Sequence, residues 1–112
     1  MTNITDEFML EMLSTTKPYC VLILWAGPNS NHPDREKIVW EHGRRNFVLR
    51  AEGLLSIVCP VSGGGEVSGI GIFNAAVEEV KKIMDEDPAV KAGVFVYDLY
   101  ASRSFPGDCL PG

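Results

Sequence analysis

The sequence predicts one α+β domain whose elements follow the order strand, helix, strand, strand, helix, strand. Three observations support this prediction. A chain of 112 residues has room for one hydrophobic core, two long segments repeat their apolar residues at helical spacing, and four short apolar runs have the length and composition of strands. Hydrophobic residues make up 46% of the chain and charged residues 22%, which is typical of a packed globular protein.

The first predicted element is a short amphipathic helix at residues 5–14. Thr5 can cap its first turn, acidic residues follow there, and apolar residues recur after them at helical spacing. Pro18 disfavours helix in the residue before it, so we expect the helix to end ahead of it. Residues 19–25 are then consecutive apolar residues, which is typical of a strand covered on both faces.

The longest predicted helix begins at Asp34 and ends near Glu52, where Gly53 stands in the position that favours a C-cap glycine. Successive helical residues lie about 100° apart, and this spacing gathers mainly apolar side chains on one arc and charged ones on another. The first arc holds Ile38, Val39, His42, Asn46 and Leu49. We therefore expect that arc to pack on the sheet.

Three further strands and a second long helix are predicted in the rest of the chain. Residues 54–61 and 69–73 are strands joined by a glycine-rich connection that is too short for a helix, so they should form a hairpin. Residues 75–84 have helical spacing and end before an Asp-Pro pair, and residues 93–100 form the last strand. This order, βαββαβ, is that of the ferredoxin-like fold, in which both helices cover one face of a four-stranded antiparallel sheet.

The predicted sheet has apolar residues on both faces, although the two helices can cover only one of them. Residues 19–25 are apolar at every position, and in the last strand Val96 lies on the side opposite Phe95 and Tyr97. An uncovered apolar face of this kind marks an association surface. We therefore predict a homodimer that forms through the sheet face left open by the helices.

Charge and composition exclude several classes of partner. The net charge of −5 disfavours nucleic acid, because such binding depends on Lys and Arg residues that neutralise phosphates. Asp6, Glu7 and Glu11 stand where a secretory signal needs positive charge, and no segment approaches the length of a membrane span. We therefore expect a cytoplasmic protein that binds neither nucleic acid nor a membrane.

The three cysteines favour a reducing compartment over a disulfide framework, because the count is odd and no CxxC spacing occurs. Cys20 and Cys59 lie within apolar runs, so we predict that both are small buried hydrophobic residues. Cys109 lies in a tail rich in Pro and Gly, where no neighbouring residue would activate the thiol.

His42 is the most informative polar residue, because it lies within the apolar arc of its helix. A polar ring at such a position needs a hydrogen-bonding partner. One interpretation is a core histidine bonded to a backbone carbonyl. The other is a general acid and base, since imidazole can both accept and donate a proton under physiological conditions.

Asp87 precedes Pro88 at the end of the second long helix. Taken alone, it is interpreted as a turn residue, because Asp-Pro commonly initiates turns. Both helices lie on the same sheet face in the predicted fold, so a carboxylate at the end of one can approach a side chain of the other. A carboxylate bonded to one ring nitrogen of His42 would select the tautomer and leave the other nitrogen free for chemistry.

Two other motifs do not match known cofactor sites. The glycines within residues 63–71 lack the Gly-Lys-Ser/Thr ending of a phosphate loop, and they lie between two strands rather than between a strand and a helix. His32 and Asp34 could contribute to a metal site, yet the chain has two histidines and no HxxxH or CxxC spacing. We therefore predict neither a cofactor nor a metal, and interpret His32 as a loop residue.

Short segments between residues 19 and 100 carry a resemblance to a known family. They are Ala26-Gly-Pro, Glu41-His42, Glu52-Gly53-Leu54, Gly69-Ile-Gly-Ile-Phe73, Asp85-Glu-Asp-Pro88 and Ala92-Gly93. In their order and spacing they resemble the YCII-related proteins. The resemblance implies a dimeric ferredoxin-like fold, called the dimeric α+β barrel, and an active site that pairs a histidine of the first long helix with the aspartate of the Asp-Pro motif. These positions are His42 and Asp87 here.

The resemblance also implies a division of the chain, since members of the family usually open with the first strand. Residues 1–16 would be an accessory N-terminal helix, and residues 17–112 a YCII-like ferredoxin-like domain. Two further departures concern single motifs: Cys59-Pro60 replaces the usual Gly-Pro after the second strand, and Ala89 replaces an aromatic residue that often follows the Asp-Pro pair. Both would reshape a pocket, so no substrate is carried over from the family.

Two functions from different classes are open at this point. One is a cofactor-independent enzyme, of isomerase or lyase type, that acts on a small organic molecule by proton transfer, with His42 as acid and base and Asp87 as its orienting residue. The other is a non-catalytic module that binds a small metabolite in the same pocket. An open cavity with His42 at its wall favours the enzyme, whereas a sealed histidine favours a binding or structural role.

Overall fold

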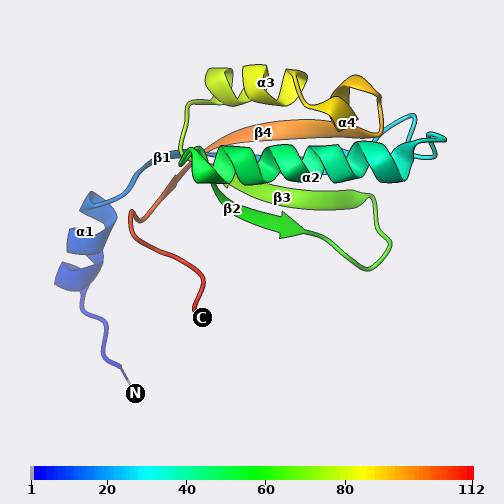
Figure 1. Cartoon of the computed structure of the whole chain (residues 1–112). Coiled ribbons are helices and arrows are strands. Elements are labelled where there is room, and N and C mark those ends of the chain that lie inside the picture. Colours follow the sequence, from blue (N-terminus) through cyan, green and yellow to red (C-terminus); the bar gives the residue numbers. More distant parts are fainter. Residues whose placement is uncertain (1) are drawn as a thin grey trace.

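The computed structural model describes residues 2–112 as an α+β fold with one four-stranded antiparallel sheet (Figure 1). The elements in chain order are α1 (Asp6–Ser14), β1 (Lys17–Ala26), α2 (Arg35–Ala51), β2 (Leu55–Pro60), β3 (Val67–Phe73), α3 (Val77–Asp85), α4 (Pro88–Lys91) and β4 (Phe95–Ser104). The strand order β2-β3-β1-β4 places β2 and β4 at the edges, and this arrangement fits a ferredoxin-like fold. None of the helices in residues 2–112 combines the length and the apolar composition that a membrane span requires.

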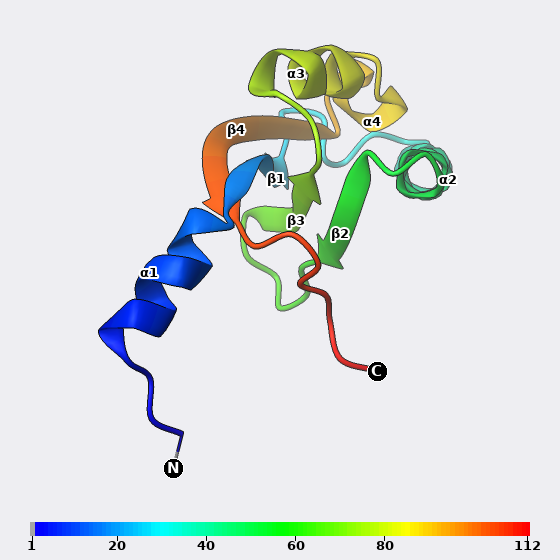
Figure 2. The same cartoon turned by 90° about the vertical axis from the view of Figure 1, so that its left-hand side faces the viewer.

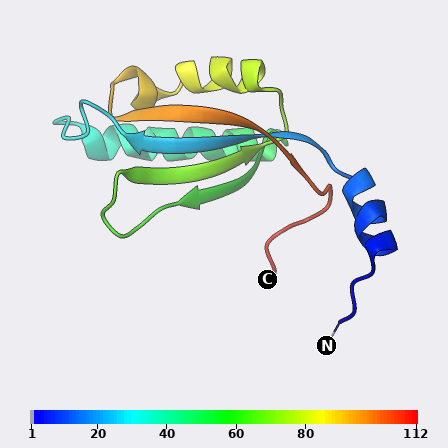
Figure 3. The same ribbon diagram turned by 180° about the vertical axis from the view of Figure 1, so that it is seen from behind.

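Helices α2, α3 and α4 cover one face of the sheet, and the described chain places no helix over the other face (Figures 2 and 3). Alternate residues of the central strand β1 follow this arrangement. Cys20, Leu22 and Leu24 are buried under the helices, whereas their neighbours Val21 and Ile23 point to the open face. The buried core is completed by apolar residues of the other elements, namely Leu49, Leu55, Phe73, Val80, Met84, Ala89, Val94 and Phe95.

The predicted apolar arc of α2 faces the sheet. His42 and Leu49 are buried, and the other members of the arc are half-buried. The helix begins after Asp34 and ends ahead of Gly53, as predicted. The φ angle of Gly53 is 78°, a left-handed conformation that favours glycine just after a helix.

Two predictions about the C-terminal half need correction. The last strand extends to Ser104 instead of ending near Tyr100, because it pairs with β1 along its whole length down to Lys17. The Asp-Pro pair does more than end the second long helix, since the short helix α4 begins at Pro88. The fixed φ angle of proline suits this first helical position.

The cysteine predictions are right for Cys20, which is fully buried, and wrong for Cys59, which is exposed. The reason is the position of β2 at the edge of the sheet, where Cys59 pairs with the exposed Ile70 of β3. An apolar run was therefore insufficient to predict burial of both faces of that strand.

Helix α1 forms where it is predicted, and the Thr5 hydroxyl accepts the N–H of Phe8 as its N-cap. We expect its apolar residues to dock either on the same subunit or across a dimer. Docking on the same subunit is wrong, because no residue of α1 is buried and the helix extends beyond the end of the sheet (Figures 1 and 3). Docking across a dimer stays a prediction.

Candidate functional site

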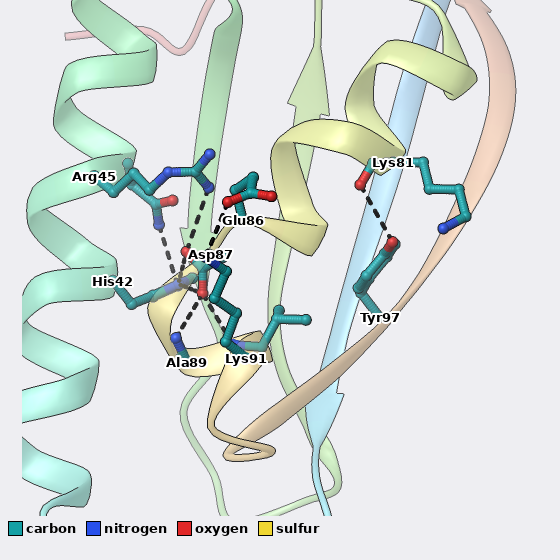
Figure 4. Close-up of polar contacts among 10 residues, drawn as sticks. His42, Arg45, Lys81, Glu86, Asp87, Ala89, Lys91 and Tyr97 are labelled. Atoms are coloured by element: carbon teal, nitrogen blue, oxygen red, sulfur yellow. Dashed lines mark hydrogen bonds and ion pairs between the residues drawn. The ribbon is translucent and has the colours of Figure 1, made fainter.

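His42 and Asp87 meet where α2 passes α4 (Figure 4). The Nδ1 atom of His42 lies 2.8 Å from Oδ1 and 2.9 Å from Oδ2 of Asp87. An ionised carboxylate can only accept hydrogen bonds, so Nδ1 donates its proton and the other ring nitrogen, Nε2, keeps a lone pair. The contact expected between these two residues is therefore present, and it selects the tautomer that a base acting through Nε2 needs.

The backbone of α4 holds Asp87 in place. Pro88 restricts the residue before it to extended conformations, and Asp87 has φ −68° and ψ 132°. In this conformation its Oδ2 atom accepts the N–H of Ala89 at 3.0 Å and that of Val90 at 3.2 Å. Asp87 is thus the N-cap of α4 as well as the partner of His42, so its two interpretations, as a turn residue and as a functional partner, are compatible.

Two further residues of α2 complete this polar cluster, and neither was predicted as a site residue. The Nη1 atom of Arg45 lies 3.8 Å from Oδ1 of Asp87 and supplies positive charge beside a carboxylate that is 1% exposed. The Nδ2 atom of Asn46 lies 3.3 Å from Nε2 of His42, the nitrogen that Asp87 does not contact. Helical spacing carried the signal, because residues three and four positions after His42 share its side of the helix.

His42 forms part of the wall of an open cavity of about 710 Å³ between α2 and the sheet. Cavities of this size accommodate small molecules. The wall is mainly apolar, and Asn46 and Arg50 are polar members of it. The apolar wall includes Leu22, Leu24, Val39, Leu55, Val58 and Phe95. Asp87 lies behind the His42 ring and does not line the cavity, so a ligand would meet the imidazole and not the carboxylate.

Two glycines of β3 form part of the cavity floor. Gly69 and Gly71 are buried and face the helices. A Cβ atom on Gly71 would lie 3.2 Å from Cδ1 of Leu55 and 3.5 Å from Cδ2 of Leu22, so a side chain there would crowd the core. Sequence reasoning missed this role, although glycine inside a strand often marks a close approach of other groups.

The remaining residues considered from the sequence lie outside this cluster. His32 is in the loop between β1 and α2, as interpreted, where its Nδ1 accepts the N–H of Asp34 at 3.0 Å. Within residues 2–112, no group of three or more His, Cys, Asp and Glu side chains could hold a metal ion.

A second group of polar contacts joins α3 to β4, where the Tyr97 hydroxyl lies 3.5 Å from the backbone carbonyl of Lys81 (Figure 4). The hydroxyl of Tyr97 donates to Oδ1 of Asp85 at 2.6 Å, and Nζ of Lys81 donates to Oδ2 at 2.7 Å. Burial, together with the hydrogen bond to Asp85, raises the pKa of Tyr97 to about 12. This phenol therefore stays neutral and acts as a structural donor at ordinary pH.

Comparisons with known proteins add no functional assignment. Neither a protein-family model nor a curated protein matches this chain. The chain itself presents an α+β fold with a buried His–Asp pair beside an apolar cavity.

Proposed function

We propose that this protein is a cofactor-independent enzyme of the YCII-related family that moves a proton on a small organic molecule, as an isomerase or a lyase does. The observation that carries the proposal is the position of His42, whose Nδ1 is bonded to the buried Asp87 while its ring lines the cavity. A carboxylate in this position stabilises the imidazolium that forms when Nε2 accepts a proton.

The donor beside Nε2 indicates which kind of proton the site suits. The Asn46 amide is 3.3 Å from Nε2, so a ligand that displaces it from the ring has a hydrogen-bond donor next to the base. A C–H group beside a carbonyl fits this pair. His42 accepts the proton, the electrons of the C–H bond move to give an enolate, and Asn46 donates a hydrogen bond to the enolate oxygen. In an isomerase, the enolate is conjugated to a double bond and takes the proton back from the imidazolium at another carbon of that system. In a lyase, the enolate re-forms the carbonyl as the bond between the β-carbon and a leaving group breaks, and the imidazolium gives its proton to the departing group.

We also propose that the protein is a homodimer joined through the open face of the sheet. Ile70, Val96 and Tyr100 are exposed by 40%, 44% and 50% on that face. Asp98 lies there too, but it accepts a hydrogen bond from the indole of Trp25 at 2.9 Å, which reduces the cost of covering it. Two such faces packed together would bury these residues and form the dimeric barrel that the resemblance implies.

A non-catalytic module that binds a small metabolite is the second candidate, and one observation favours it. Only 8% of His42 is exposed, and the Asn46 amide lies against Nε2, so the base is covered before a ligand arrives. The polar cluster would then shape the pocket, and no proton would be exchanged with the ligand.

Hydrogen–deuterium exchange separates the two candidates. Small carbonyl compounds with acidic C–H groups are incubated with the protein in D₂O, while calorimetry measures their binding and NMR follows deuterium incorporation. The enzyme proposal expects incorporation into a bound compound and a loss of at least about 100-fold in His42→Ala. His32→Ala, which alters the loop histidine, is the matched control and should keep the full rate. Binding without exchange in the unmodified protein would reject the enzyme and support the binding module.

A further inference from the structure

Helix α1 carries apolar side chains that its own subunit does not cover. Phe8, Met9, Met12 and Leu13 recur at helical spacing on one side of the helix. Their exposed fractions run from 37% for Met12 to 55% for Leu13, and Leu10 at their margin is 70% exposed. A helix of 9 residues is marginal in water without a packing partner. The apolar side of α1 therefore needs a surface that covers it.

The connection to β1 keeps α1 away from the body of its own subunit. Only Thr15 and Thr16 separate the two elements. Arg103 of β4 clamps this connection, since its Nε donates to the Thr16 hydroxyl at 3.1 Å and its Nη2 donates to the Thr16 carbonyl at 2.7 Å. The helix accordingly points outward from the end of the sheet (Figures 1 and 2).

The outer side of α2 has a groove that suits a helix. Trp40 and Phe47, two turns apart, are 70% and 69% exposed, and they line a groove of about 500 Å³ with Gly43 between them. Glycine inside a helix costs about 0.5–1 kcal/mol relative to alanine. A Cβ atom on Gly43 would meet nothing within 4 Å, so packing inside the subunit does not require this glycine. A helix lying between the two aromatic rings would require it, because its backbone could then approach closely.

Charge favours the same pairing of surfaces. Helix α2 contains five basic and two acidic residues in a protein whose net charge is −5, whereas residues 2–16 contain three acidic residues and no basic one. Arg35 and Arg44 line the groove together with Glu36, and Arg44 is paired with Glu41 at 2.9 Å. The attraction therefore acts as long-range steering of α1 toward α2 and not as one specific ion pair.

We infer that α1 of one copy of this chain docks in the α2 groove of a second copy, with its apolar side between Trp40 and Phe47. The α1 helix of the second copy docks on the first copy in the same way. This reciprocal contact gives a closed two-fold dimer in which the apolar surfaces of α1 and α2 are covered in both copies. This inference goes beyond the proposed function, because the exchange of helices needs neither a substrate nor catalysis.

Trp40 reports on this docking directly. Trp25→Phe leaves Trp40 as the sole tryptophan of the full chain, and acrylamide quenching then measures its exposure. The inference expects Trp40 to be protected, and it expects Phe8→Ser combined with Met12→Ser to shift its emission to the red and abolish the protection. Both changed residues are exposed in the subunit, so its fold is retained. Ser14→Ala, which is exposed on the opposite side of α1 and leaves its charge unchanged, is the control that keeps the protection.

Co-expression shows whether α1 acts on its own copy or on the partner. Two versions of the chain are co-expressed and purified through the tag on one of them. The tagged version has an intact α1 and no tryptophan (Trp25→Phe, Trp40→Phe). The untagged version keeps Trp40 as its sole tryptophan and carries the two substitutions in α1. Protection of Trp40 in this complex supports exchange between copies. Failure to co-purify, an unprotected Trp40 in the complex, or equal quenching with and without the α1 substitutions would overturn the inference. His42→Ala should keep the protection, which separates this inference from the proposed catalysis.

Discussion

The two faces of the sheet differ in what covers them more than in their composition. On the helix side, Cys20, Leu22 and Leu24 are at most 7% exposed, whereas Val96 and Tyr100 on the open side are 44% and 50% exposed. Both sets of residues come from strands rich in apolar side chains. The difference shows that an apolar pattern identifies residues that are stabilised by burial. Whether they are buried within the subunit depends on whether the chain supplies helices to pack on that face.

The largest difference in stability is expected between the centre of the covered face and the open face. Phe73→Ala removes a ring that is fully buried, which should cost about 3–5 kcal/mol. Tyr100→Ala removes a ring that is half exposed and should cost the subunit less than about 1 kcal/mol. Urea denaturation at low protein concentration measures both free energies. Equal losses would contradict a core confined to the helix side.

A second contrast is between two aspartates that each accept a hydrogen bond from a ring N–H. Asp87 is 1% exposed, so Asp87→Ala should cost roughly 2–4 kcal/mol, because it leaves Nδ1 of His42 unpaired and removes the N-cap of α4. Asp98 is exposed on the open face, and Asp98→Ala should change the free energy of unfolding by at most about 0.5 kcal/mol. Thermal and urea denaturation provide the comparison, and a loss of similar size at Asp98 would contradict it.

Asp87→Asn tests the chemistry of the covered face with little change in its fold. The amide oxygen can still accept the N–H groups of Ala89 and Val90, so we expect α4 to be retained. The amide nitrogen would donate to Nδ1 and favour the wrong tautomer of His42. The rate of deuterium incorporation into a bound compound should therefore fall by at least about 100-fold. A folded variant with the original rate would remove Asp87 from the proposed mechanism.

Val96→Lys should act on the open face alone. A lysine within the proposed interface would raise the dimer dissociation constant at least about tenfold, which corresponds to about 1.4 kcal/mol. Val48→Lys changes an exposed valine of α2, on the helix side of the sheet, and serves as the control. Light scattering over a dilution series measures both constants. Equal masses for the two variants at every concentration would place the interface elsewhere.

The smallest effect on stability is expected from the titration of Tyr97 and Asp85, at the solvent edge of the covered face. The pKa of Tyr97 is raised from 10.0 to about 12, so its contribution to stability is complete below pH 10.0 and is lost as the pH rises through about 12. Hydrogen bonds from Lys81 and Tyr97 lower the pKa of Asp85, so its contribution is present above 3.8 and is lost as the pH falls through the lower folded value. Asp85 is exposed and Tyr97 is half-buried, so solvent screening limits both effects.

Absorbance titration tests this assignment. Asp85→Asn removes the carboxylate that the Tyr97 hydroxyl contacts, so the pKa of Tyr97 should move toward its ordinary value. In Tyr97→Phe the absorbance change that belongs to the Tyr97 phenol should be missing, which assigns that change to Tyr97. An unchanged titration in Asp85→Asn would mean that burial alone sets the pKa of Tyr97.

The His42–Asp87 pair shows how far sequence reasoning reached in the candidate site. Helical spacing placed His42 on the arc that faces the sheet, and the order of elements placed α2 beside the end of the second long helix, so their contact could be predicted. The contacts of Arg45 and Asn46 were not predicted, because they depend on side-chain rotamers and on the level at which α2 passes α4.

The sequence by itself determined the positions of most helices and strands and the side that each turns to the core. These features depend on residues close together in the chain, such as the cap at Thr5 and the glycine that follows α2. Only the tertiary structure decided that Cys59 lies on an exposed edge, that Gly69 and Gly71 leave space for a cavity, and that α1 extends away from its subunit. Each of these depends on how elements far apart in the chain pack against one another, and local patterns carry no measure of those distances and angles.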